Sequence, residues 1–424
     1  MTAREFTFRL LLRQKKEGAY SNLLLDNHLK ASDLSGQDKA FATALFYGVI
    51  ETQIYLDYQL EGALKQPLKK LRDEVFIALR MGVYQLFLMD KVPAAAAINE
   101  SVKLVKKHGC AYAAGLVNAV LRALSRSGER LPEQSDKRYL SVKYAIPQAL
   151  IDLWIKDYGK SDTIGILESF STKSAQTVVR VNTLLCDRDS LLQRLKSEGV
   201  EARVNEAVEN SLVLKKSGAL TLIPSFREGL FHVEDTAAQK AALLLGALEG
   251  ERVLDTCAAP GGKSFTVAEQ MKSGEVLACD IYESRVALIR EGAQRLHIPF
   301  IKACVQDASE YHESLGLFDR VLCDVPCSGL GTIAKKPEIR YKTKEQIMAC
   351  VPVQKRILAT SFRYLKPGGT LVYATCTLNK AENEEVIEAF LRESKAQLVF
   401  QKTFFPHTDT TDGFFAAVIK KDDS

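Results

Sequence analysis

The sequence lacks the features of a membrane protein, a disulfide-stabilised secreted protein or a zinc protein. No apolar run approaches the ~20 residues that a transmembrane helix requires, and the opening MTAREFTFRLLLRQKKEGAY carries too many charges for a secretory signal core. The nine cysteines are odd in number and form no CxxC pair, and the six histidines are scattered. We therefore expect a cytoplasmic protein with reduced thiols, no metal ion and no membrane segment.

Positive charge is concentrated near the N-terminus. The net charge of the chain is +5. Residues 1–130 contain 19 Lys or Arg and 13 Asp or Glu, a net charge of +6, whereas residues 131–424 contain 38 and 39, a net charge of −1. A basic domain beside a neutral one suits a polyanionic partner. An ordinary solvated surface explains the same numbers equally well.

Length and periodicity divide the 424 residues into three parts. A chain of this length exceeds one typical core, so two or three domains are expected. Residues 1–130 repeat apolar side chains at helical spacing, which predicts a bundle of five or six helices. Residues 131–230 are typical of a polar linker and a small α+β module, with strands expected within Thr177–Leu184, Ser211–Lys216 and Ala219–Ile223. In residues 231–424 strands alternate with helices, which predicts a doubly wound α/β sheet.

The stretch Asp255–Phe265, DTCAAPGGKSF, is the most informative of the α/β part. The apolar pair before it predicts a buried strand, and the residues from Ser264 onward predict a helix. Between them a Gly-Gly pair leaves room for a ligand close to the backbone. Known nucleotide motifs do not specify that ligand. There is no G-x-G-x-x-G, and Cys257 occupies the position where a phosphate loop requires its first glycine.

Three acidic residues follow predicted strands of the same sheet. Asp280, Asp307 and Asp324 end the stretches EVLACD, FIKACVQD and DRVLCD. In a parallel sheet such ends meet at one edge, where these sheets bind their ligands. Asp280 comes 19 residues after Gly261, a spacing that suits a carboxylate accepting hydrogen bonds from ribose hydroxyls. Any one of the acids alone is explained as a helix cap, but the coincidence of three favours a ligand site.

Two cysteines also lie at predicted strand ends. Cys327 stands in Asp-Val-Pro-Cys-Ser-Gly and Cys376 in Ala-Thr-Cys-Thr. A thiolate there can attack carbon, as a pyrimidine requires, because its carbon 5 is a poor nucleophile until something adds at carbon 6. Asp324 beside the ring would hold nitrogen 3 and ease the addition. Lone cysteines are usually buried small hydrophobes, which suits those inside predicted strands, namely Cys279, Cys304 and Cys323.

The motifs DTCAAPGGKSF, DVPCSGLGT and YATCTLNKAENEEVI resemble those of RNA cytosine-5 methyltransferases that use S-adenosylmethionine. The helical start, with GQDKAFATALFYGVIETQIYLD and KVPAAAAINESVKLVKKHG, is similar to the NusB-like domain of the RsmB type, the bacterial members of the RsmB/NOP family that act on 16S ribosomal RNA. RVNTL and TDGFFAAVIKK match too, so the resemblance covers nearly the whole chain. It implies a NusB-like helical RNA-binding domain at 1–130, a linker and α+β module at 131–230, and a Rossmann-like methyltransferase domain at 231–424, in a protein that we expect to be a monomer.

The resemblance also implies roles for individual residues. Asp280 would bind the cofactor ribose, Asp307 the adenine side, and Asp324 would lie between the cofactor and the base. Cys376 would be the nucleophile, and Cys327 would assist release of the methylated base. The cofactor loop would be formed by Cys257, Ala258, Ala259, Pro260, Gly261, Gly262 and Lys263.

Some points stay open on the sequence. The residues alone do not rank the two cysteines, since in related DNA-modifying enzymes the Pro-Cys residue attacks. Val325 and Leu330 replace a commoner Ala and Thr, but the acid, the Pro-Cys pair and both glycines of that motif remain. Transfer RNA is an alternative substrate, and a non-catalytic RNA-binding assembly or antitermination factor is an alternative function. The intact set of one aspartate and two cysteines argues against a decayed site.

Overall fold

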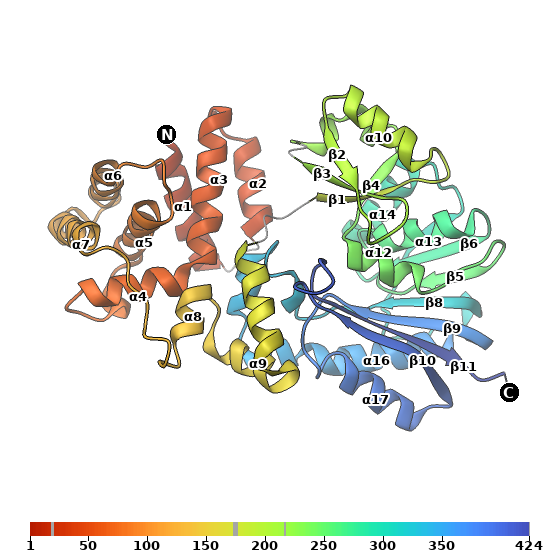
Figure 1. The fold of residues 1–424 in the computed structure, drawn as a ribbon. Coiled ribbons are helices and arrows are strands. Elements are labelled where there is room, and N and C mark those ends of the chain that lie inside the picture. Colours follow the sequence, from red (N-terminus) through yellow and green to blue (C-terminus); the bar gives the residue numbers. More distant parts are fainter. Residues whose placement is uncertain (18–20, 173–176, 216–217, 424) are drawn as a thin grey trace. The chain divides into compact units, whose positions relative to one another are not determined.

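The structure is a computed structural model that describes residues 1–17, 21–172, 177–215 and 218–423 (Figure 1). The chain divides into two compact units. One contains Met1–Thr163 with Lys335–Tyr341, and the other contains Ile164–Ala334 with Lys342–Ser424. Among the described helices, none combines the length and the apolar composition needed to cross a membrane.

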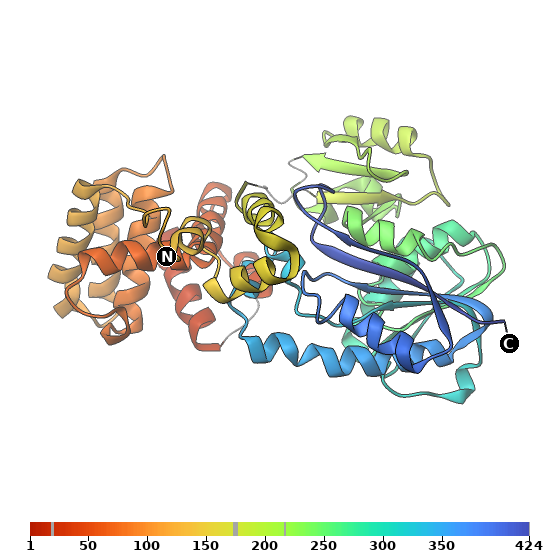
Figure 2. The same ribbon diagram turned by 60° about the horizontal axis from the view of Figure 1, so that its bottom comes forward.

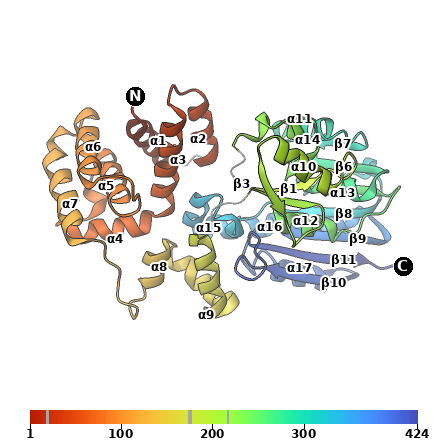
Figure 3. The same ribbon diagram turned by 45° about the horizontal axis from the view of Figure 1, so that its top comes forward.

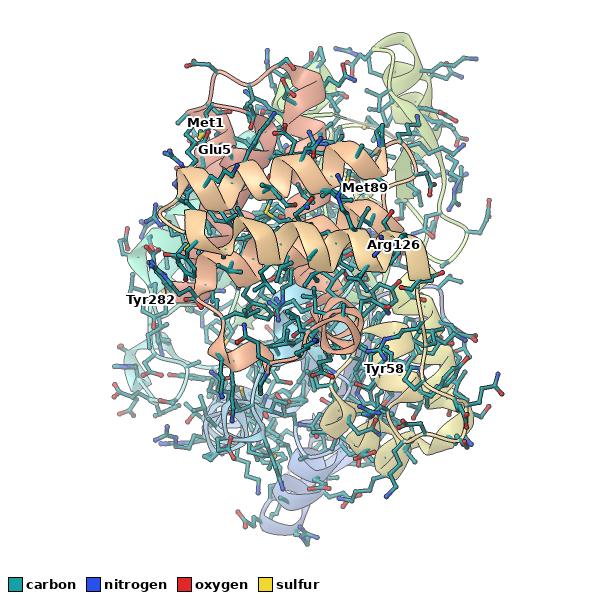
Figure 4. The ribbon with its side chains drawn as sticks, turned by 90° about the vertical axis from the view of Figure 1, so that its left-hand side faces the viewer. Met1, Glu5, Tyr58, Met89, Arg126 and Tyr282 are labelled. Carbon is teal, nitrogen blue, oxygen red and sulfur yellow. The ribbon has the colours of Figure 1, made fainter. Side chains whose placement is uncertain are left out.

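The first unit is all helical, as the periodicity predicts. Most of its buried apolar residues form one core. Figure 4 shows α6 and α7 side by side on one face, with the labelled Met89 and Arg126 at the same end. The described part of residues 1–130 forms seven α-helices, one more than the upper expectation, because Thr52 leaves the helical conformation between α3 and α4. The helices of the unit are α1 Ala3–Glu17, α2 Ser21–Lys30, α3 Gly36–Glu51, α4 Gln53–Ala63, α5 Asp73–Phe87, α6 Ala94–Lys107, α7 Ala114–Ser127, α8 Tyr139–Tyr144 and the first part of α9 Gln148–Thr172.

A short segment from much later in the chain completes this unit. It contains the 3₁₀ helix η6, Pro337–Tyr341. Arg340 is 5% exposed and donates from Nη1 to the carbonyl oxygens of Glu51 at 2.7 Å and Ala145 at 3.3 Å. Ser21 Oγ donates to Glu338 at 2.6 Å. The chain therefore leaves the α/β unit just after the Pro-Cys motif, packs into the helical unit and returns.

The second unit begins with a small antiparallel sheet in the order β2-β3-β1-β4. The helix α10 Arg188–Ser197 packs on it through Leu191 and Leu195 (Figure 3). Two of its strands, β2 and β4, were not predicted, and the strand expected at Ala219–Ile223 is wrong. That stretch forms the 3₁₀ helix η3 Leu220–Leu222, directly before Pro224, which starts the short helix α11 Pro224–Arg227. Lys216 lies outside the described residues. The strands are β1 Thr177–Val181, β2 Glu201–Val204, β3 Ser211–Lys215 and β4 Phe231–Val233.

The large sheet of the second unit is doubly wound, as predicted. Its order is β10-β11-β9-β8-β5-β6-β7, with β5 to β9 parallel and β11 antiparallel to both of its neighbours. One apolar cluster joins α12, α13 and α14 to one face, and a second joins α16 and α17 to the other (Figure 2). The strands are β5 Arg252–Asp255, β6 Glu275–Asp280, β7 Ile301–Val305, β8 Phe318–Asp324, β9 Leu365–Thr375, β10 Ala396–Phe404 and β11 Phe414–Lys421; the helices are α12 Thr236–Leu243, α13 Gly262–Met271, α14 Glu283–Arg295, α15 Lys344–Met348, α16 Cys350–Arg363 and α17 Glu384–Glu393.

Two boundaries differ from what the sequence suggests. The run Lys366–Gly369, Lys-Pro-Gly-Gly, is typical of a helix end, yet α16 has already ended and the run lies inside β9. The extra residues are absorbed where the register with β8 shifts between Phe318 and Arg320. The helix α13 begins at Gly262 rather than Ser264, so the glycine turn is shorter than expected.

Candidate active site

The glycine turn after β5 is held by its own hydrogen bonds. Ser264 Oγ donates to Asp255 Oδ2 at 2.6 Å, and the Gly261 N–H donates to the Ala258 carbonyl at 2.7 Å. Gly261 has a φ of 114°, and a Cβ there would collide with the ring of Phe265. Because α13 starts at Gly262, its first N–H groups have no acceptor within the helix. The turn therefore offers unsatisfied donors and a positive dipole end to an anionic group of a ligand.

The structure places the three predicted acids along the carboxyl edge of the sheet. Asp280 ends β6 and is buried; its Oδ1 accepts from the Tyr282 N–H at 3.3 Å, and its Oδ2 lies 3.3 Å from Arg285 Nη1. Asp307 lies two residues beyond β7 and accepts from the Ser309 N–H at 2.8 Å. Hydrogen bonds from Ser309 hold the pKa of Asp307 below its ordinary value. Hydrogen bonds thus fix both carboxylates at the carboxyl edge of the sheet, the same edge at which the glycine turn lies.

Asp324, the third acid, is paired with the lysine of the glycine turn. Asp324 ends β8, and its Oδ2 lies 2.7 Å from Lys263 Nζ, with both side chains largely shielded from solvent. Burial lowers the pKa of Lys263, but attraction to Asp324 and Glu234 outweighs burial, and the pKa ends above its ordinary value. A charged ammonium group is therefore present at the site.

The two strand-end cysteines meet beside this ion pair. Cys327 Sγ and Cys376 Sγ are 3.3 Å apart, although 49 residues separate them in the chain. The hydrogen bond with Cys376 and burial both raise the pKa of Cys327, so Cys327 stays a protonated thiol at neutral pH. Attraction to Cys376 is a smaller contribution to the raised pKa of Lys263. The structure thus identifies Cys327 as a thiol that is held in its protonated form, which the sequence alone did not reveal.

Comparison with known proteins assigns the family. A model described as 16S rRNA methyltransferase RsmB/F matches residues 242–420, the NusB family model matches 1–126, and a model of the RsmF/B-like ferredoxin-like domain matches 146–221. The probable ribosomal RNA small subunit methyltransferase B of Bacillus subtilis is 34% identical over 99% of both chains. That of Proteus mirabilis is 34% identical over 92% of both chains. The chain belongs to the RsmB/F family. A solved structure named PH0851 covers 99% of both chains with 25% identity and a TM-score of 0.83.

Glu382, a buried acid close to the cysteine loops of this RsmB/F chain, was not singled out by the sequence analysis. Glu382 is 0% exposed and accepts four hydrogen bonds from neighbouring loops and from α16. It lies in Asn-Lys-Ala-Glu-Asn-Glu-Glu, a polar run before α17 that predicts only a solvated helix start. A polar run directly after a strand-end cysteine was the feature of the sequence that could have indicated a buried acid near Cys376.

The geometry supports thiol chemistry on a ligand held at the sheet edge. Within the described residues no group of three or more His, Cys, Asp or Glu is placed to hold a metal ion. A lysine–aspartate pair, two adjacent thiols and a helix start with free donors lie together in the RsmB/F catalytic unit. Such a set can bind a charged ligand, form a carbon–sulfur bond and move a proton between sulfurs.

Proposed function

We propose that this RsmB/F chain transfers a methyl group from S-adenosylmethionine to carbon 5 of a cytosine in 16S ribosomal RNA through a covalent cysteine–cytosine adduct. The observation that carries the proposal is the 3.3 Å approach of Cys327 and Cys376 beside the Lys263–Asp324 pair. Named relatives that match the full length of the chain are small-subunit ribosomal RNA methyltransferases.

The residues at the sheet edge fit S-adenosylmethionine. Its carboxylate suits the N–H groups at the start of α13, and its approach to the backbone needs the room that Gly261 leaves. The ribose hydroxyls suit Asp280, and the adenine side suits Asp307, as in other sheets that bind nucleosides at this edge. The cofactor would be held by these acids and by the loop Cys257–Lys263, and it would supply an electrophilic methyl group.

Cys376 is proposed as the nucleophile. An ammonium group near its sulfur favours the thiolate, the reactive form. The thiolate adds to carbon 6 of the cytosine, a carbon–sulfur bond forms, and the displaced electron pair makes carbon 5 nucleophilic. As charge builds on the ring, nitrogen 3 takes up a proton from solvent, and Asp324 accepts the hydrogen bond of that N–H and so stabilises the adduct.

Cys327 is proposed to assist release of the product. Its raised pKa keeps the proton on this sulfur, which lies within reach of the Cys376 sulfur. Once carbon 5 carries its methyl group, a base removes the proton from carbon 5. The electron pair of that C–H bond re-forms the double bond between carbons 5 and 6, and the carbon–sulfur bond breaks with its electron pair returning to Cys376. A thiol at this distance stabilises the departing thiolate by donating a hydrogen bond to it.

The helical unit is proposed to bind the RNA. Its residues 1–130 carry a net charge of +6, and the NusB family model covers nearly all of them. We expect a cytoplasmic, monomeric protein with domains at 1–130, 131–230 and 231–424. These boundaries, the monomeric state and the cytoplasmic location remain predictions.

Methyl transfer from labelled S-adenosylmethionine tests the proposal. Full-length protein is incubated with 16S ribosomal RNA, small-subunit particles or bulk transfer RNA, and label is mapped to carbon 5 of cytosine. Label in 16S ribosomal RNA or in the particle is expected. Label only in transfer RNA would replace the proposed substrate, and no label in any RNA, with RNA binding retained, would favour a non-catalytic RNA-binding protein.

A further inference from the structure

Glu382 lies at the centre of a buried polar network beneath both cysteines. Its Oε1 accepts from Ser328 Oγ at 2.5 Å and from Asn379 Nδ2 at 2.9 Å. Its Oε2 accepts from the Ser328 N–H at 2.8 Å and from Gln354 Nε2 at 2.9 Å. The four donors are neutral, so hydrogen bonds rather than an ion pair replace the water that this carboxylate lost on burial.

The network joins the two cysteine loops to each other. Ser328 follows Cys327 in the chain, and its Oγ lies 2.7 Å from Oγ1 of Thr377, the residue after Cys376. The same Thr377 oxygen accepts from the Leu330 N–H at 3.2 Å. Gln354 of α16 also donates to the Pro326 carbonyl at 3.0 Å. Glu382 therefore connects, through one or two hydrogen bonds, the residues that follow each sulfur and the helix below them.

The charge of Glu382 is placed on one side of the sulfur pair. It contributes to the raised pKa of Cys327, after the hydrogen bond with Cys376 and burial. Glu382 is hydrogen-bonded to the residue after Cys327, and Lys263 is paired with Asp324 at the glycine turn. The site therefore holds an anion bonded to the Cys327 loop and a cation at the glycine turn, an arrangement suited to separating the two thiols in acidity.

We propose that Glu382 is a positioning residue that assigns the two cysteines their different roles. Its hydrogen bonds fix the separation of the loops that carry Cys327 and Cys376, and its charge directs the thiolate to Cys376. The inference deepens the proposed function and rests on it for the meaning of the two roles. The difference between the sulfurs can be measured without RNA or cofactor.

Other ionisable groups lie around the sulfur pair and Glu382, and their charges must stay constant in a test. Their contribution is the same in any Glu382 variant that keeps the fold, so a change in the ratio of the two reactivities reports on Glu382. They are Lys263 on α13, Asp324 at the end of β8, Lys342 bonded to the Ser328 carbonyl, Cys350 on α16 and Tyr373 on β9.

The substitution Glu382→Gln removes the negative charge and replaces one of the two accepting oxygens with an amide group that donates. Each carboxylate oxygen receives at least one N–H, so an amide group placed there points its own N–H₂ at a donor in either orientation. Asp319→Asn is the matched control. Asp319 accepts from the Arg252 N–H and pairs with Lys366 at the opposite end of the strands, so its loss costs stability without reaching the cysteines.

Alkylation by iodoacetamide, followed by peptide mass spectrometry between pH 6 and 9, measures the rate at each sulfur of the full-length protein. In the unmodified protein and in Asp319→Asn, Cys376 is expected to react about tenfold or more faster than Cys327 at neutral pH. In Glu382→Gln the ratio is expected to fall to within about threefold of unity, with the Cys327 profile moving to lower pH. An unchanged ratio in folded Glu382→Gln overturns the proposal.

A second variant covers the case in which Glu382→Gln does not fold. Ser328→Ala removes the hydroxyl that donates to Glu382 Oε1 and the link to Thr377 but keeps the buried charge, so it is expected to lower the ratio less than Glu382→Gln does. A ratio identical to that of the unmodified protein would contradict the positioning role. In methyl-transfer assays both variants should lower kcat and leave the KM for S-adenosylmethionine unchanged. Failure of the unmodified protein to methylate any RNA would reject the proposed function, whereas the alkylation ratio tests Glu382 separately.

Discussion

Two pairs of cysteines in the catalytic unit have similar sulfur separations and different surroundings. Cys279 and Cys304 are paired in register on β6 and β7, with their sulfurs 3.0 Å apart. Cys327 and Cys376 lie beyond the ends of β8 and β9, with their sulfurs 3.3 Å apart. Close approach of two sulfurs is therefore not what distinguishes a reactive pair in this fold.

Acidity does not distinguish the pairs either. A hydrogen bond from Cys279 lowers the pKa of Cys304 below that of an ordinary thiol, which favours the Cys304 thiolate. Yet Cys279 lies in the apolar cluster under α16 and α17, and Cys304 packs against that cluster. The strand-end pair has Lys263, Asp324 and Glu382 around it. The pair Cys327–Cys376 is a candidate for catalysis because it lies at the ligand-binding edge of the sheet with charged groups around it.

The sharpest test of this contrast removes one sulfur from each pair. Cys376→Ala is expected to lower methyl transfer by on the order of 10³-fold or more, because the carbon–sulfur bond cannot form. Cofactor affinity, measured by calorimetry, should be unchanged. Cys304→Ala should keep turnover within a few-fold of the unmodified protein. Comparable losses in both variants would erase the distinction between the pairs.

The second test compares the partner sulfurs. Cys327→Ala is expected to slow turnover by on the order of 10²-fold and to leave a covalent protein–RNA adduct, since no thiol assists the release of Cys376. A denaturing gel with labelled RNA would show a slow-moving band. Cys279→Ala, the matched control, should give no such band and lose only about 1 kcal/mol of stability. Absence of the band from Cys327→Ala would remove the release role.

A buried carboxyl at the end of β5, that of Asp255, allows a test that depends on pH. Burial raises the pKa of Asp255 to about 7, so the folded state holds a proton that the unfolded chain releases near pH 4. Stability from this proton is present below the unfolded pKa and is lost as pH rises through about 7. Asp255→Asn mimics the protonated form and can still accept from Ser264. It should be more stable than the unmodified protein by on the order of 2–4 kcal/mol at pH 8 and by much less at pH 5.

Urea unfolding at both pH values measures that difference. Burial raises the pKa of Glu269 to about 7 too, but Glu269 is present in both proteins and its contribution cancels in the comparison. An equal gap at pH 5 and pH 8 would mean that Asp255 is not protonated in the fold.

The sequence predicted those parts of the site that strand ends determine. Apolar runs that stop at Asp280, Asp324 and Cys376 indicate strand ends on their own, and a parallel sheet brings such ends to one edge. The glycine turn is equally local, because Gly261 and Gly262 limit the possible conformations. These features depend on a few adjacent residues and on one topological rule, so a single sequence is sufficient.

What depends on packing could not be predicted. Glu382 stands among acids that are typical of an exposed helix start, and only the meeting of two loops with α16 buries it. The strands β2 and β4 are too short for a period of two to be evident, and pairing with β3 and β1 determines them. The Cys279–Cys304 contact needs the register of β6 against β7, which no local pattern contains.

The smallest expected effect is a shift in the reactivity of Cys304. Its alkylation by iodoacetamide should show a midpoint near pH 7, because the Cys279 thiol donates a hydrogen bond to its sulfur and stabilises the thiolate. Cys279→Ala removes the donor and should move the midpoint up by about one to two pH units toward an ordinary thiol, whereas Cys279→Ser keeps a donor and should move it less. Equal shifts in the two variants would show that packing, rather than the hydrogen bond, sets this acidity. If Cys304 is ionised and its Cys304→Ala variant still methylates RNA, then ionisation alone does not make a cysteine catalytic. The thiolate must also lie where substrate binds.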